Sequence, residues 1–151
     1  MRRSAGIIPY KIVDNDIYIY LEHPGGPYWK GINKWSICKG EFNKGKEKAT
    51  TAAVREFYEE SNFKIEEQEL DYLSSYKVSN NKLLIIFIAN TDIDCSRMKS
   101  NTFKKVFNGV LKEFPEMDEA KWFKLDDAVD IIFDNQVVFL NKLKEKVSSI
   151  I

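Results

Sequence analysis

Cysteine is scarce in this sequence, and the chain also lacks long apolar runs. The 151 residues include two cysteines, Cys38 and Cys95, with no Cys-x-x-Cys spacing, which argues against a disulfide framework and a zinc site built from cysteines. No segment approaches the roughly 18 consecutive apolar residues of a transmembrane helix, and the basic N-terminus is not followed by a long apolar run. We therefore expect a cytoplasmic protein that does not associate with membranes.

An excess of charge of either sign is also missing. Lys+Arg and Asp+Glu number 23 each, so the formal net charge is zero. No global basic field attracts nucleic acid, so we expect no nucleic-acid partner, and an anionic ligand has to be held by a local site. Hydrophobic residues make up 44% and aromatic residues 13% of the chain, which excludes a disordered chain. This length fits one domain, residues 1–151.

Short apolar runs separated by turn residues predict the order of strands and helices. Asp14 and Asn15 are turn residues that would join the first two strands into a hairpin, and Asp126 is a candidate helix N-cap. The runs predict strands at 4–13, 16–22, 35–38, 70–78, 83–90 and 119–125, helices at 46–61, 126–133 and 135–147, and irregular structure over 92–116. This order predicts an α/β sandwich around a mixed β-sheet.

The segment from Gly40 to Phe63 carries the strongest chemical signal. Its predicted helix has Glu56, Glu59 and Glu60 in the second half, where carboxylates oppose the helix dipole at about 0.3–1 kcal/mol each. Glu56 and Glu60 are four residues apart on one face, and their repulsion costs about 0.2–0.5 kcal/mol more. A bound Mg²⁺ or Mn²⁺ would explain such a cluster of hard oxygen ligands; the alternative is a solvated helix face with weak surface ion pairs.

The same segment resembles the signature of the Nudix hydrolases, G-x5-E-x7-R-E-U-x-E-E-x-G-U, in which U is apolar. Glu47 lies seven intervening residues before Arg55, residues 55–60 read Arg-Glu-Phe-Tyr-Glu-Glu, and Phe63 fills the last apolar position. The chain departs from the pattern at two places. Six residues rather than five separate Gly40 from Glu47, and Asn62 replaces a glycine. Asparagine is the common substitute for glycine in the left-handed conformation that ends a helix.

Other segments resemble a bacterial branch of predicted Nudix pyrophosphohydrolases. These segments are residues 21–27, 35–40, 100–103 and 113–123, and residues 35–40 also resemble the diadenosine polyphosphate hydrolases. Residues 4–10 look like the first strand of the Nudix family. The chain differs from that branch at Cys38, where proline is more usual, and at Lys104 and Lys105, where acidic residues are usual. These differences put a distal acidic metal ligand in doubt.

The resemblance implies a Nudix-type fold and hydrolysis of a nucleoside diphosphate linked to another group, X, by water attack at phosphorus. Carried onto this sequence, it implies that Glu56, Glu59 and Glu60 bind the metal, with Mg²⁺ as cofactor and Mn²⁺ as a possible substitute. Glu59 and Glu60 would also act in catalysis. Glu47 and Arg55 would brace the loop and the helix.

The general base stays open between Glu59 and a loop acid, Glu113 or Glu116, although exposed glutamates are most often only solvated.

A substrate phosphate could be met by Lys39, and Gly40 would let the backbone approach the metal closely. Three aromatic residues could stack on a nucleobase, although each could instead serve packing: Tyr28, Trp29 and Phe42. His23 is interpreted as structural and Cys38 as a small buried residue.

The substrate class we expect is a small nucleotide, with dinucleoside polyphosphates or nucleoside triphosphates first and nucleotide sugars open. Two alternatives remain at this point. One is a Nudix domain that binds nucleotides without cleaving them, and the other is an interaction domain with no ligand.

Overall fold

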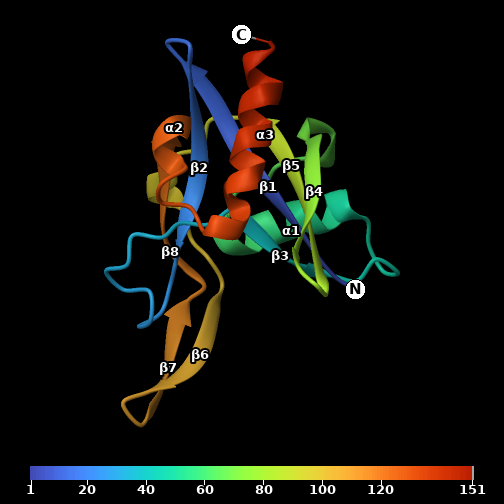
Figure 1. The fold of residues 1–151 in the computed structure, drawn as a ribbon. Helices are drawn as coiled ribbons and strands as arrows, with labels where there is room; N and C mark the ends of the chain where they lie inside the picture. Colours follow the sequence, from blue (N-terminus) through green and yellow to red (C-terminus); the bar gives the residue numbers. More distant parts are fainter. Residues whose placement is uncertain (151) are drawn as a thin grey trace.

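A mixed β-sheet with helices on both faces forms the body of the molecule (Figure 1). The computed structural model describes residues 1–150. The strand order along the sheet is β4 (Asp71–Ser79), β5 (Lys82–Asn90), β1 (Arg2–Val13), β2 (Asp16–Pro24) and β8 (Met117–Lys124), and β3 (Cys38–Phe42) also pairs with β1. β1 and β5 run parallel and the other pairs run antiparallel.

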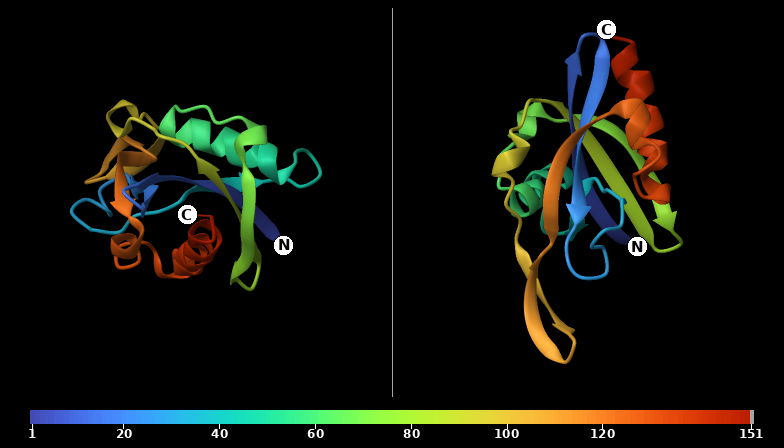
Figure 2. Two further views of the ribbon diagram at one scale, coloured as in Figure 1. Left: turned by 90° about the horizontal axis from the view of Figure 1, so that it is seen from above. Right: turned by 90° about the vertical axis from the view of Figure 1, so that its left-hand side faces the viewer.

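Helix α1 (Ala49–Ser61) covers one face of the sheet, and α2 (Leu125–Ala128) and α3 (Val137–Ser148) cover the other (Figure 2). Short 3₁₀ turns lie at η1 (Glu67–Glu69), η2 (Cys95–Arg97) and η3 (Asp134–Gln136). Two apolar clusters result, one between the sheet and α1 and one between the sheet and α2 with α3. The predicted α/β sandwich around a mixed sheet is confirmed.

Alternation along the strands decides which cluster each side chain joins. In β5, Leu84, Ile86 and Ile88 face α3 while Phe87 and Ala89 face α1, so this strand is covered on both faces as its apolar run predicts. The predicted first hairpin is also confirmed, because Asp14 and Asn15 adopt positive φ angles of 51° and 67° between β1 and β2.

The prediction of irregular structure over 92–116 is wrong for residues 102–115. β6 (Thr102–Phe107) and β7 (Val110–Pro115) form a separate two-stranded sheet that extends away from the body (Figures 1 and 2). Asn108 and Gly109, with φ of 52° and 77°, make the two-residue turn. An Asn-Gly pair between alternating residues is the strongest short-range hairpin signal in a sequence.

Several element boundaries also differ from expectation. The helix expected over 126–133 is shorter, because α2 ends at Ala128. The third strand begins at Cys38, where residues 35–38 were expected, so Gly40 lies within β3 rather than in a loop. α1 begins at Ala49 rather than at 46. Asp126 is not an N-cap, because Lys124 has that position and Asp126 pairs instead with Lys144 of α3.

No helix in residues 1–150 is both long and apolar enough to cross a membrane.

Candidate active site

Glu56 and Glu60 project from α1 toward β3, which confirms that they share one helix face. A Cβ atom added to Gly40 would collide with the carboxyl group of Glu56, so only glycine lets β3 approach this close. The Glu56 side chain is 13% exposed. Glu60 Oε2 is buried without a hydrogen-bond partner in the described residues. Two carboxylates from α1 are thus held against β3, Glu56 at the backbone of Gly40 and Glu60 near the Cys38 side chain.

Arg55 connects the acidic residues of this segment. Its guanidinium donates to Glu47 through Nη2 at 2.6 Å and Nε at 3.3 Å, and through Nη1 to Glu56 at 2.8 Å and to Glu59 at 3.3 Å. Such a bidentate arginine–carboxylate pair fixes orientation as well as charge. Arg55 therefore ties the segment before α1 to the carboxylates of the helix.

The extra residue between Gly40 and Glu47 is taken up by a turn. The amides of Lys46 and Glu47 both donate to the Asn43 carbonyl, and the Gly45 amide donates to Asn43 Oδ1. Glu47 still reaches Arg55 after this turn. The longer segment therefore leaves the Glu47–Arg55 contact in place.

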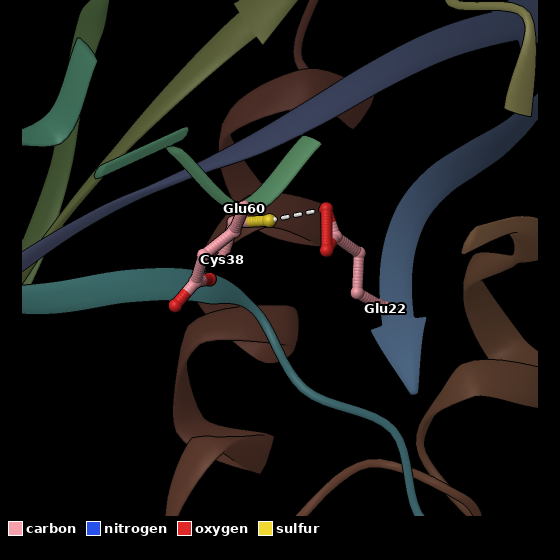
Figure 3. A group of neighbouring side chains, drawn as sticks. All are labelled: Glu22, Cys38 and Glu60. Carbon is pink, nitrogen blue, oxygen red and sulfur yellow. Dashed lines mark hydrogen bonds between the residues drawn. The ribbon is translucent and has the colours of Figure 1, made fainter. Parts of the chain in front are cut away.

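A fully buried acid, which the sequence interpretation did not single out, lies beside Glu60. Figure 3 shows Glu22 from β2, Cys38 from the start of β3 and Glu60 from the last turn of α1 as neighbours. The Cys38 thiol and the Tyr20 hydroxyl donate to Glu22 Oε1 at 2.7 and 2.8 Å, while Glu22 Oε2 has no partner in residues 1–150. Cys38 is buried as expected, but its thiol bonds to a carboxyl group.

Alternation in β2 is the signal that could have found Glu22. Ile19 and Leu21 face α3, so Tyr20 and Glu22 face α1, and Tyr20 packs on Phe57 of that helix. A charged residue in an otherwise buried strand has to meet a partner on its face.

Burial and mutual repulsion favour the protonated forms of these acids. Burial is the main cause that raises the pKa of Glu60 to about 9, and the charges of Glu22 and Glu56 add to it. Burial also raises the pKa of Glu22 to about 7 and raises that of Glu56. These side chains therefore need protons or a cation to balance their charge.

The donor set fits a divalent cation. Glu56, Glu59 and Glu60 offer the hard oxygens that Mg²⁺ and Mn²⁺ prefer. The unpartnered Oε2 of Glu60 is a free ligand atom in a buried position. One ligand atom from each of Glu22, Cys38 and Glu60 also lies within 4.8 Å of the others.

The chain after η2 brings further polar groups to Glu59. The Asn101 amide donates to the Glu59 carbonyl at 2.8 Å, and the Glu116 amide donates to the Asn101 carbonyl at 2.8 Å. The charge of Glu116 contributes to the raised pKa of Glu60, so Glu116 belongs to the same region. Glu113 is exposed on the hairpin opposite Lys104.

An open hollow beside Glu59 is lined in part by a basic side chain, Lys99, that the sequence interpretation did not single out. It is lined by Arg55, Tyr58, Glu59, Asn62, Lys99, Ser100 and Asn101. Lys99 carried no signal of its own in the sequence, because long-range backbone hydrogen bonds bring it here: the Lys99 amide donates to the Ser61 carbonyl and the Asn101 amide to the Glu59 carbonyl.

The other sequence candidates lie in different surroundings. Lys39 is half-buried in β3 and interacts with the Glu60 charge, and burial lowers its pKa. Trp29 packs edge-on against Phe133, and Tyr28, which is 68% exposed, packs edge-on against Trp29. Phe42 packs against the α1 cluster. Of the three aromatic residues, Tyr28 has the most accessible ring.

His23 is held by structural contacts. Its Nδ1 lies 2.8 Å from Asp118 and its Nε2 lies 2.7 Å from the Ile32 carbonyl. The histidine thus ties β2 to the loop that follows it and to β8.

Comparisons with known proteins agree with this arrangement. A family model described as the NUDIX domain matches residues 2–143. An RNA pyrophosphohydrolase of Pelagibacter ubique (strain HTCC1062) is 32% identical over 127 residues, which cover 79% of this chain and 77% of that protein.

Two solved structures show the same fold. An Ap4A hydrolase of C. elegans in a binary complex has a TM-score of 0.66 at 21% identity, covering 99% of each chain. The NUDIX domain of Shewanella oneidensis NrtR, complexed with ADP ribose, has a TM-score of 0.65 at 10% identity, covering 96% of this chain and 87% of that one. With the family model matching most of its length, the chain belongs to the NUDIX domain family and is a hydrolase.

Proposed function

We propose that the protein hydrolyses a phosphoanhydride bond in a nucleoside diphosphate linked to another group, by metal-dependent attack of water at phosphorus. The observation that carries this proposal is the placement of two α1 carboxylates against β3, Glu56 at the Gly40 backbone and Glu60 beside Cys38, with a buried Glu60 oxygen left without a partner. A structural helix would gain nothing from placing two carboxylates there.

Glu56, Glu59 and Glu60 would hold Mg²⁺, with Mn²⁺ as a substitute. When bound, the cation would activate water and neutralise charge on the diphosphate. The raised pKa of Glu60 supports this assignment, because a nearby divalent cation favours the ionised carboxylate that burial disfavours.

Arg55 and Glu47 would position these ligands. Arg55 touches Glu47, Glu56 and Glu59, so it fixes the direction of two proposed ligands at once. Its own charge also limits repulsion between them.

The proton acceptor is proposed to be Glu59 or Glu116. Glu59 is 38% exposed at the open hollow, which suits a group that exchanges protons with solvent. The Glu116 charge acts on Glu60, whereas Glu113 lies on the exposed hairpin opposite Lys104. Glu113 is therefore the weaker candidate of the two loop acids.

A nucleotide with a di- or polyphosphate is the proposed substrate class. Lys39 beside Glu60 and Lys99 in the hollow offer positive charge for its phosphates. Tyr28 offers an exposed ring to a base. The relatives widen the panel to be tested, since one is an RNA pyrophosphohydrolase and another an Ap4A hydrolase.

The test is an assay of the purified protein with Mg²⁺ against four substrate classes, with products identified by mass. These are dinucleoside polyphosphates, nucleoside triphosphates, nucleotide sugars and RNA with a 5′-triphosphate. We expect cleavage of a phosphoanhydride bond that is lost in chelator and falls by orders of magnitude in Glu60→Gln. Glu69→Gln is the matched control, because Glu69 is exposed on η1 and should keep parent activity. Nucleotide binding without turnover on any substrate, with Mn²⁺ also tried, would contradict the proposal.

A further inference from the structure

The cluster of Glu22, Cys38 and Glu60 includes a thiol, a ligand that a Mg²⁺ site does not require. Two of its ligand atoms are carboxylate oxygens and the third is sulfur. Mg²⁺ selects oxygen ligands, whereas sulfur ligands favour softer cations such as Zn²⁺. The sulfur lies on the strand residue two positions before Gly40, against which Glu56 packs.

Glu22 is the group that makes the cluster more than a surface set of acids. Its side chain is fully buried, with 0% exposure, and its Oε2 atom has no partner in the described part of the chain. A buried carboxyl oxygen without a partner loses its hydration and gains no hydrogen bond in return. Glu60 Oε2 is unpartnered as well, so two buried oxygens lack partners beside one thiol (Figure 3).

We propose that Glu22, Cys38 and Glu60 form a binding site for a thiophilic divalent cation of the Zn²⁺ class, with one thiolate and two carboxylates as ligands. Glu60 would be shared with the Mg²⁺ site of the proposed function, and to that extent the inference rests on it. Cys38 would bind as thiolate after its proton, and any proton on the carboxyl groups, passes to solvent. Three protein ligands are as many as catalytic zinc sites use.

The distances between the three ligand atoms permit tetrahedral zinc binding after small side-chain movements. Tetrahedral zinc bonds of about 2.0–2.3 Å place neighbouring ligand atoms about 3.5 Å apart. The three ligand atoms already lie within 4.8 Å of one another. Cys38 Sγ and Glu22 Oε1, now hydrogen-bonded at 2.7 Å, would separate by about 1 Å.

The surroundings suit a cation that enters from one side. Glu22 and Cys38 are buried, while Glu60 is half-buried, so the Glu60 side of the cluster is the one nearest to solvent. The two carboxylates and the thiolate carry more negative charge than one divalent cation neutralises. Lys39 interacts with Glu60 and Cys38 and offsets part of the remainder.

The experiment uses Co²⁺ as a spectroscopic probe for this site. The full chain, reduced and freed of metal, is titrated with Co²⁺ while absorbance is recorded in the near ultraviolet, where thiolate-to-cobalt charge transfer appears. We expect a band that saturates at one equivalent, disappears on addition of Zn²⁺ and persists in excess Mg²⁺. No band, or a band that Mg²⁺ removes as readily as Zn²⁺ does, would overturn the proposal.

Two cysteine variants test which cysteine provides the sulfur ligand. Cys38→Ser should lose the band, and Cys95→Ser should keep it, because Cys95 lies on η2 outside the cluster. A band that survives in Cys38→Ser would overturn the assignment. Circular dichroism confirms that each variant is folded.

Glu22→Gln is a second variant in case Cys38→Ser fails to fold. It keeps the oxygen that accepts from Tyr20 and Cys38 but removes the charge, so Co²⁺ affinity should fall by roughly tenfold or more while the sulfur band remains. Unchanged Co²⁺ affinity would overturn the proposal.

The cobalt experiment can fail independently of the test of the proposed function. Mg²⁺-dependent hydrolysis measured in the same preparation, without the cobalt band, would overturn the soft-metal site alone. A cobalt band without hydrolysis would leave this site standing and overturn the proposed enzyme activity.

Discussion

Gly40 shows how a single missing side chain shapes the site. It lies in β3 opposite Ala5, with no positive φ, so its backbone conformation is open to other residues. What excludes a larger residue is space, because its Cβ would meet the Glu56 carboxyl group. The glycine thus sets how close the α1 carboxylates come to the strand.

Gly40→Ala should therefore impair catalysis more than folding. The added methyl group displaces the Glu56 carboxylate, and a displacement near 1 Å at a reacting site costs on the order of a hundredfold in kcat/KM. Gly45→Ala is the matched control, because the new Cβ would lie 3.3 Å from Asn43 Oδ1 on an exposed turn. Steady-state kinetics and melting temperature check the prediction, and kcat/KM within twofold of the parent for Gly40→Ala would contradict it.

The α1 element carries charges that its own dipole disfavours. Glu56, Glu59 and Glu60 lie in its second half, and the last turn has no basic residue to offset them. Arg55 supplies that offset from one turn earlier. The element ends at Asn62, whose φ of 68° is left-handed and whose amide donates to the Tyr58 carbonyl.

Substitution of Asn62 tests whether the glycine found at this position of the Nudix signature would change the stability of this protein. Asn62→Gly should raise the free energy of unfolding by up to about 1 kcal/mol, because glycine adopts positive φ without strain. Asn62→Ala should lower it by about 1 kcal/mol. Urea unfolding measures both, and Asn62→Gly should keep parent activity. An alanine variant as stable as the glycine variant would refute the strain argument.

At the scale of the molecule, the sheet topology assembles the buried acids. β1 pairs with β3 through Arg3–Ile7 and with β2 through Tyr10–Val13, so the two strands meet along one edge of β1. Glu22 and Ser36 form a bridge there, which places Glu22 beside Cys38. The burial of these carboxyl groups therefore depends on the pairing of several strands and not on one element alone.

The stability of the metal-free protein should therefore fall as pH rises. Glu22 and Glu60 have raised pKa values of about 7 and about 9. The folded state thus keeps protons that the unfolded chain releases above about pH 4.5, so stability present below that pH is lost as pH rises through the folded pKa values. For Glu22 the loss is on the order of 3 kcal/mol, since one pKa unit corresponds to about 1.4 kcal/mol.

Urea unfolding in chelator from about pH 5 to about pH 9 measures this loss. Glu22→Gln cannot ionise, so its stability should fall less than that of the parent between about pH 5 and pH 7. The exposed acids with lowered pKa values, Glu41, Glu67 and Asp94, affect the pH dependence of stability only below this pH range. Parallel pH profiles for parent and variant would contradict the prediction.

Local sequence determined much of what the structure contains. The helix with its three glutamates, the Asp14-Asn15 hairpin, the left-handed Asn62 and the doubly covered β5 follow from periodicity and from residue-specific backbone preferences, which act over a few residues. The Asn108-Gly109 turn was equally local, and missing it led to the wrong prediction for 92–116. The assignment of the whole chain to one domain stays a prediction.

Tertiary structure alone decided the surroundings of the carboxylates. Glu22, Cys38 and Glu60 are separated in sequence and meet only because β2, β3 and α1 pack together. Lys99 and Glu116 likewise reach the site through backbone hydrogen bonds, Lys99 with Ser61 and Glu116 with Asn101. Burial and the resulting pKa shifts depend on these long-range contacts, which no local pattern encodes.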